Sequence, residues 1–269
     1  MKIPKVFRDN LLLKMTSLNA VVIGIRLLVS LFIQRFLAET VGEVGISKIG
    51  QLRNFTSLLT SASTGGIFNG VTKYVSEFKD DEVQLQKMFS TAFFFKTVGT
   101  IVTSLILFFG AETISNYLFG SLNFEYLIKL LAVIVPFIAM YRVFNGVVHG
   151  LSAYKNFAKI DLFSYLLGAV LLIISLYKYN IDGALVAIAI TPVIQFLVLL
   201  FIFFKTLKEY IHFSKLSFKI PFAKELLAFT LMSFVSTGLL NFVEIDLRTI
   251  IRNQITEADS GIWTAMTFI

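Results

Sequence analysis

Residues 181–204 read IDGALVAIAITPVIQFLVLLFIFF, and the only charged side chain among them is Asp182. A transmembrane helix needs about 20 predominantly apolar residues, so this stretch is long enough to cross a bilayer. Its apolar run is continuous, whereas a strand of a membrane barrel alternates between apolar and polar residues. The stretch therefore predicts a membrane-spanning α-helix, and it sets the expectation for the rest of the chain.

Six further segments are also long and predominantly apolar. They are Leu11–Leu37, Ile49–Val71, Met88–Phe109, Leu127–His149, Leu162–Leu176 and Leu226–Phe242. The tail Gly261–Ile269 resembles the beginning of an eighth helix. The sequence therefore predicts an all-α polytopic membrane protein.

The composition excludes several classes of protein. The chain has 269 residues, of which 56% are hydrophobic and 15% charged, with a mean hydropathy of +0.79. A soluble domain carries about 25% charged residues, so a soluble enzyme or a disordered chain is disfavoured. The lack of cysteine excludes a disulfide and cysteine-ligated zinc or iron–sulfur sites. No HExxH or GxxxxGK[ST] motif is present, and we expect no metal, cofactor or catalytic residue.

The net charge of +7 is explained by basic loops on one side of the membrane. No basic cluster is interleaved with stacking aromatic residues, so we expect no nucleic-acid partner. The basic residues of the N-terminal tail and of every second loop are Lys2, Lys5, Arg8, Lys73, Lys79, Lys87, Lys155, Lys159, Lys205, Lys208, Lys215, Lys219 and Lys224. The opposite side has only Arg35, Lys48, Lys129 and Lys178 near its loops. We therefore expect a cytoplasmic N-terminus.

These segments suggest four parts. Residues 1–10 form a cytoplasmic tail, and residues 11–204 a six-helix transmembrane bundle. Residues 205–225 form a basic cytoplasmic linker, and residues 226–269 contain a seventh helix and the start of an eighth.

Arg26 is the most informative charge, because it lies near the middle of the first span. At 1.5 Å per residue the nearer end, Leu37, is about 16 Å away, which is too far for easy snorkelling. A cation at that depth needs an aqueous cavity, an anionic ligand or a partner. A structural ion pair is the plainer alternative.

Three further cations, Arg53, Lys96 and Arg142, lie at other depths in the second, third and fourth spans. Together with Arg26 they predict a ladder of positive charge that would suit a diphosphate, which arginine binds through charge-assisted hydrogen bonds. Snorkelling to headgroups is the alternative, above all for Lys96 and Arg142.

Acidic groups in or near the spans are fewer. Asp161 precedes the fifth span, while Glu244, Asp246 and Arg248 follow the seventh. Glu244 and Arg248 are four residues apart, which allows an ion pair on one helix face. Ion coupling or gating is one hypothesis for this group, and a structural pair at a helix end is the other.

Residues 65–78, GGIFNGVTKYVSEF, resemble the end of the second helix in Wzx-type polysaccharide flippases. Shorter matching stretches follow the same order along the chain. They are residues 42–45 (GEVG), 150–155 (GLSAYK), 183–185 (GAL), 229–232 (FTLM) and 261–263 (GIW). Arg53 occupies a position that is arginine in the family, and Arg26 one where the family carries lysine.

The resemblance implies a member of the multidrug/oligosaccharidyl-lipid/polysaccharide (MOP) exporter superfamily, related to the MATE transporters. That fold has two bundles of about six helices around a central cavity. Such proteins move undecaprenyl-diphosphate-linked oligosaccharides, such as enterobacterial common antigen or O-antigen units, across the bacterial inner membrane by alternating access. In that setting Arg26 and Arg53 would hold the lipid diphosphate. The glycan polymerase and chain-length regulator of the same pathway are candidate partners.

The chain stops where the family's eighth helix begins, so it corresponds to a six-helix N-terminal bundle plus the start of the second bundle. A fragment, a truncated gene product and a half that assembles with another chain all fit this length. Two other functions stay open: a cation-coupled drug or metabolite exporter of the same superfamily, and a non-transporting membrane scaffold for glycan assembly.

Overall fold

The computed structural model describes residues 11–64, 67–217 and 219–267, and all regular elements in these ranges are helical. The elements are α2 (Leu11–Thr64), α3 (Ile67–Phe78), α4 (Glu82–Phe109), α5 (Ala111–Phe119), η1 (Leu122–Phe124), α6 (Glu125–Gly150), α7 (Tyr154–Tyr210), η2 (Phe213–Lys215), α8 (Ala223–Ser233), η3 (Phe234–Gly238), α9 (Leu239–Gln254) and α10 (Glu257–Thr267). The expected tail 1–10, the glycines at 65–66 and the last two residues of the expected eighth helix lie outside the described residues.

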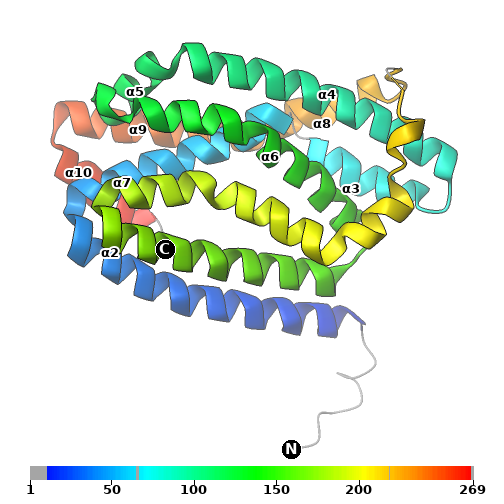
Figure 1. Cartoon of the computed structure of the whole chain (residues 1–269), viewed down its shortest axis with the longest axis horizontal. Helices are drawn as coiled ribbons and strands as arrows, with labels where there is room; N and C mark the ends of the chain where they lie inside the picture. Colours follow the sequence, from blue (N-terminus) through cyan, green and yellow to red (C-terminus); the bar gives the residue numbers. More distant parts are fainter. Residues whose placement is uncertain (1–10, 65–66, 218, 268–269) are drawn as a thin grey trace, which may run out of the picture.

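Two elements, α2 and α7, are too long to be single membrane spans. A straight helix of the 57 residues of α7 would measure about 85 Å, against a hydrocarbon core of about 30 Å. Each element instead folds back on itself at a bend, as Figure 1 shows. The backbone is non-helical at Gly42 in α2, with φ +64°, and at Tyr179 and Asn180 in α7. Each of these elements therefore supplies two antiparallel spans.

Glycine is required at both bends for different reasons. Gly42 adopts a positive φ, which side chains with a Cβ rarely tolerate. At Gly183 the two arms of α7 approach so closely that a Cβ would lie 2.2 Å from the carbonyl oxygen of Ser175. The bends are thus encoded locally, although their tightness is visible only in the folded chain.

The seven expected spans overlap five long apolar helical segments, two of which carry two spans each. The second expected span, Ile49–Val71, extends past the first segment and ends in α3. The segments are Thr16–Thr64, Glu82–Phe109, Leu122–Gly150, Tyr154–Tyr210 and Ala223–Gln254. The expectation of an all-α, multi-pass membrane protein is confirmed. Several boundaries differ, because amphipathic and polar turns extend the helices beyond their apolar runs. The fifth span begins at Tyr154, the seventh continues through a π-helical turn to Gln254, and the last helix begins at Glu257.

The connections gather at two opposite ends of the bundle (Figure 1). One end holds the turns around residues 79–81, 151–153 and 211–222, and we call it the basic end because it carries the lysine-rich loops. The far end holds the two bends, the short helix α5 and the turn before α10. The lysine-rich loops therefore lie together at one end, which agrees with the basic residues in every second loop of the sequence.

The polar face of α4 fixes the segment that connects α7 with α8. The backbone N–H groups of Ser217 and Phe222 donate to Ser90 Oγ and Thr91 Oγ1 of α4, at 3.0 and 3.3 Å. At its start, α4 is capped by Asp81, whose carboxylate accepts from the backbone N–H of Gln84 at 3.1 Å. The connection therefore packs on the bundle and is not a free linker.

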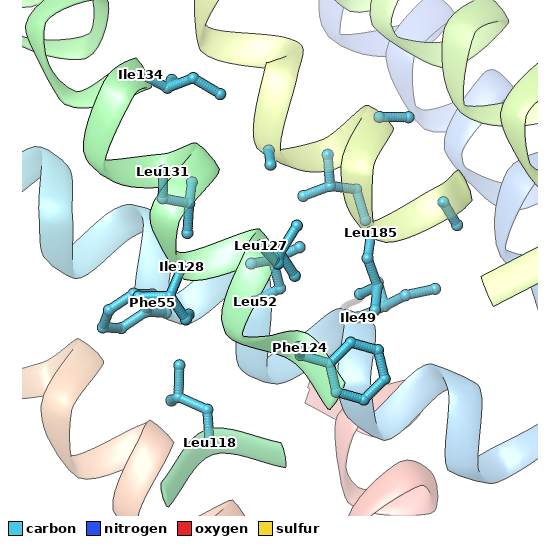
Figure 2. Packing of buried hydrophobic residues seen from close by; sticks show 14 of the residues in the cluster. Ile49, Leu52, Phe55, Leu118, Phe124, Leu127, Ile128, Leu131, Ile134 and Leu185 are labelled. Atoms are coloured by element: carbon cyan, nitrogen blue, oxygen red, sulfur yellow. The ribbon is translucent and has the colours of Figure 1, made fainter. Parts of the chain in front are cut away.

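The apolar core divides into two clusters along the bundle. Figure 2 shows the cluster nearer the far end, where Ile49, Leu52 and Phe55 of α2 pack against Leu127 and Leu131 of α6. The cluster nearer the basic end joins α3, the start of α4, and parts of α6 and α7. On α6 and on the first arm of α7, short intervals at 139–142 and 161–168 separate residues of one cluster from those of the other. Charged and hydroxyl side chains concentrate in these intervals.

Candidate functional site

An ion pair joins the first arm of α2 to the first arm of α7. Arg26 Nη1 lies 2.7 Å from Asp161 Oδ2 and 3.0 Å from Oδ1. The two residues are 135 positions apart in sequence. Their side chains remain 42% and 28% exposed, so this pair at membrane depth is not sealed inside the core.

Both partners lie on the packed faces of their helices. Arg26 continues the stripe formed by Val22, Ile33 and Leu37, which are buried side chains of the first arm of α2. Spacings of four and seven residues put these positions on one face of a helix. The guanidinium therefore points toward the other helices, where Asp161 and Tyr165 contact it.

Tyr165 holds Arg26 from the same side as Asp161. The guanidinium carbon of Arg26 lies 5.0 Å from the centre of the Tyr165 ring, which is a cation–π geometry. The Tyr165 hydroxyl donates to the backbone carbonyl of Arg26 at 3.2 Å. Because Asp161 and Tyr165 are one helical turn apart, a single face of α7 supplies both contacts.

Two more arginines lie near tyrosines that neighbour this pair. Arg53, on the second arm of α2, is half-buried and lies within electrostatic range of Tyr165. Tyr141 of α6 lies within electrostatic range of Arg26, Asp161 and Arg142. We call Arg26, Arg53, Arg142, Asp161, Tyr141 and Tyr165 the cation cluster.

Arg142 approaches the cluster from α6. Its guanidinium carbon lies 4.3 Å from the centre of the Phe68 ring, and its buried Nε has no hydrogen-bond partner among the described residues. One turn further along α6, the buried Asn145 has an unpaired Oδ1. A donor and an acceptor are thus unsatisfied at the edge of the cluster, which is costly unless a ligand or water reaches them.

Lys96 stands apart from the other three predicted cations. It is half-buried on α4, and its ammonium lies 5.8 Å from the ring of Phe93 on the same helix. Within the described residues it forms no ion pair. The structure therefore places Arg26 and Arg53 near Tyr165 and Arg142 near Tyr141, and leaves Lys96 separate.

The four residues predicted to act in ion coupling or gating, Asp161, Glu244, Asp246 and Arg248, lie in two separate places. Asp161 belongs to the cation cluster, whereas the other three residues lie on α9 near the far end. Arg248 is 2% exposed, and its Nη2 lies 3.4 Å from Glu244 Oε2 and 3.1 Å from Thr267 Oγ1. Asp246 Oδ1 accepts from the Tyr117 hydroxyl at 3.0 Å. This α9 group contacts α2, α5 and α10 instead of the cation cluster.

Sequence reasoning missed both tyrosines of the cation cluster and Ser164, a buried hydroxyl without a partner among the described residues. A signal was present, since Asp161, Ser164 and Tyr165 recur at spacings of three and four within an apolar run. Hollows of about 530 and 300 Å³ lie at the bend of α2 and beside the start of α4, away from the cluster. No group of three metal-ligating side chains occurs in the part of the chain that the structure describes.

The sequence pattern of a family described as polysaccharide biosynthesis protein matches residues 55–265. The chain belongs to this family. The match begins on the second arm of α2 and ends in α10. It includes Tyr141, Arg142, Asp161 and Tyr165 of the cation cluster, whereas Arg26 and Arg53 precede it.

Two relatives of the chain have names that state a function. The chain is 25% identical over 239 residues to proteins named lipid III flippase from Escherichia coli K12 and Shigella flexneri. The aligned region covers 89% of this chain and 58% of each relative, so the chain spans a little over half of their length.

A solved structure supports the fold. The chain superimposes with a TM-score of 0.57 on an inward-facing multidrug-resistance MATE transporter of the MOP superfamily. The match covers 89% of this chain and 57% of the transporter, at 12% identity. The expected MOP-type helical fold, present here as a part of the full transporter, is therefore confirmed, while the low identity carries no information on substrate.

Proposed function

We propose that this chain is the substrate-binding bundle of a flippase that moves undecaprenyl-diphosphate-linked oligosaccharides across the bacterial inner membrane. Membership of the polysaccharide biosynthesis family and the likeness to lipid III flippases support the class of substrate. The proposal involves no covalent chemistry, and the enterobacterial common antigen unit and the O-antigen unit both meet its chemical requirement.

One observation carries the proposal. Arg26 and Arg53, from the two arms of α2, lie near Tyr165, and Arg26 and Arg142 lie near Tyr141. Arg26 and Arg142 share the one carboxylate of the cation cluster, which leaves an excess of positive charge at membrane depth. Such charge is costly in lipid, and an anionic ligand repays that cost. A diphosphate offers several oxygens to arginine donors at once.

The mechanism that follows is alternating access around the cation cluster. The arginines shield the diphosphate from the apolar core, the glycan travels in an aqueous cavity, and the prenyl tail stays in lipid. Lys96, which lies apart from the cation cluster on α4, provides a further cation on the path of the headgroup. The α9 group, Glu244, Asp246 and Arg248, forms contacts at the far end that would have to change when that side opens.

The proposed placement has the N-terminus and the basic end in the cytoplasm, as the positive-inside rule requires. An ion gradient or removal of the glycan on the far side would supply the driving force. The glycan polymerase and chain-length regulator of the pathway are the proposed protein partners. A cationic-drug exporter is a weaker proposal, because a cationic drug favours carboxylates and this cluster carries more arginines than acids.

Native mass spectrometry of the detergent-purified chain tests the proposal. We expect undecaprenyl diphosphate carrying its oligosaccharide to bind in preference to undecaprenyl monophosphate, and a cationic drug not to compete. Arg53→Gln should weaken binding of the diphosphate lipid about tenfold, the loss of one charge-assisted contact of about 1.4 kcal/mol. Lys129→Gln removes a partly exposed cation near the far end and should leave binding unchanged. Equal binding of both lipids by the folded chain would refute the proposal.

A further inference from the structure

The ion pair between Arg26 and Asp161 has an unusual geometry for an arginine–carboxylate contact. Both oxygens of Asp161 lie against one nitrogen, Nη1, at 2.7 and 3.0 Å. A fork-to-fork pair uses two nitrogens and is the stronger arrangement. Among the described residues no acceptor is found for the other guanidinium nitrogens of Arg26. The pair therefore leaves one edge of the guanidinium open.

The chemistry of Asp161 is that of the ligand expected at the same place. A carboxylate and a phosphate each present two oxygens and negative charge to a guanidinium. An isolated cation at membrane depth is costly, and the 42% exposure of the Arg26 side chain reduces that cost without removing it. When no ligand is bound, Asp161 supplies an anion from within the chain.

We propose that Asp161 is a built-in counter-ion that occupies Arg26 in the empty site and is displaced when a lipid diphosphate binds. This inference rests on the proposed function. Asp161 thereby sets the affinity of the site: it lowers the affinity for the diphosphate and lets the ligand leave, while keeping Arg26 neutralised between transport cycles.

The surroundings of Asp161 can accept the displaced carboxylate. Ser164 lies one turn along the same face of α7, is 2% exposed, and has a buried hydroxyl with no partner among the described residues. A serine hydroxyl can donate one hydrogen bond to a carboxylate. Tyr141 of α6 also lies within electrostatic range of Asp161 and carries a second hydroxyl donor.

A purely structural ion pair predicts the opposite effect of removing the acid. If Asp161 only positions Arg26 for the ligand, its loss misplaces the guanidinium and weakens binding. If Asp161 competes with the ligand, its loss frees the guanidinium and strengthens binding. The sign of the change in affinity therefore separates the two roles.

The experiment titrates undecaprenyl diphosphate and undecaprenyl monophosphate against the detergent-purified chain and follows the complexes by native mass spectrometry. Asp161→Asn keeps the shape of the side chain and removes its charge. We expect it to bind undecaprenyl diphosphate about fivefold more tightly, the size expected for loss of a competing, partly exposed ion pair. Asp161→Ser should show a gain of the same sign, and Asp161→Glu, which keeps the charge, should stay within about twofold of the unsubstituted chain.

Arg26→Gln combined with Asp161→Asn provides the matched control. It removes both charges, leaves neither of them unpaired, and should bind more weakly than Asp161→Asn alone. Helicity by circular dichroism identifies the variants that are folded, and the binding comparison uses whichever of Asp161→Asn and Asp161→Ser keeps the native spectrum. Loss of the native spectrum in both variants would overturn the inference, because a competitor for the ligand is not needed for folding.

The outcomes separate the inference from the function on which it rests. Weaker or unchanged binding by folded Asp161→Asn, with diphosphate preference intact in the unsubstituted chain, overturns the counter-ion role alone. Absence of any diphosphate preference in the unsubstituted chain overturns the proposed function itself.

Discussion

Arg252 of α9 makes the contact whose removal gives the sharpest test of the tertiary structure. Its Nη2 donates to the backbone carbonyl of Tyr117 at 3.0 Å, and its Nη1 donates to the carbonyl of Leu118. These carbonyls belong to the last turn of α5, which ends at Gly120 in the left-handed conformation. Arg252 therefore caps, from 135 residues away, a helix end that has unsatisfied carbonyls.

The expected effect of Arg252→Gln follows from these contacts. A hydrogen bond from a charged donor contributes about 1.5–3 kcal/mol, and a cation at a helix C-terminus adds about 0.3–1 kcal/mol. One of the two bonds is exposed and the other partly buried, so solvent screening reduces the sum. We expect a loss of about 2 kcal/mol in the docking of α9 on α5, equivalent to about a 30-fold change in the opening equilibrium.

A second contact between the same helices survives this change. The Tyr117 hydroxyl donates to Asp246 Oδ1 at 3.0 Å. Burial, followed by the hydrogen bond to Asp246, raises the pKa of Tyr117, so the phenol keeps its proton at neutral pH. In Arg252→Gln the contact between α9 and α5 should therefore weaken but persist. Adding Tyr117→Phe should weaken it further.

Hydrogen–deuterium exchange read by mass spectrometry measures this local opening. We expect faster exchange in the last turn of α5 and the end of α9, with α6 unchanged. Arg35→Gln is the matched control, because it removes an arginine whose pair with Glu39 is 81% and 62% exposed and contributes little. If α5 and α9 exchange equally in Arg252→Gln and the unsubstituted chain, the capping argument is wrong.

Three further predictions concern the fold. Ser47→Cys with Ser260→Cys should form a disulfide under mild oxidation, because the two hydroxyl oxygens lie 2.9 Å apart and the chain has no other cysteine to compete. A gel shift that is reversed by reductant checks this. Absence of the cross-link would mean that α10 does not pack beside Ser47. Gly183→Val should lower the melting temperature measured by circular dichroism, because even a Cβ would meet the Ser175 carbonyl at 2.2 Å, and unchanged melting would contradict the tight bend in α7. Asp81→Ala removes the cap of α4 and should lower the free energy of unfolding by about 1 kcal/mol in denaturant titration, whereas Asp81→Asn should retain most of it.

The sequence alone determined the class of fold. Its apolar runs have the length that a bilayer requires, and that signal is local because each span must satisfy its own backbone hydrogen bonds. It also predicted the alternating charge of the loops and the spacing that pairs Glu244 with Arg248, which the structure places 3.4 Å apart. The family resemblance added the expectation of a MOP-type bundle, which the family match and the solved transporter support.

Only the tertiary structure decided the partners of the charges. The sequence predicted that Arg26 needs an aqueous cavity, an anionic ligand or a partner, but no local pattern selects Asp161, 135 residues away, over Glu244 or Asp246. That choice depends on the rotation of the first arms of α2 and α7, which many weak packing contacts set together. For the same reason the contact of Arg252 with the end of α5 could not be predicted from the sequence. Local hydrophobicity fixes which segments cross the membrane, whereas long-range packing fixes which polar groups meet inside it.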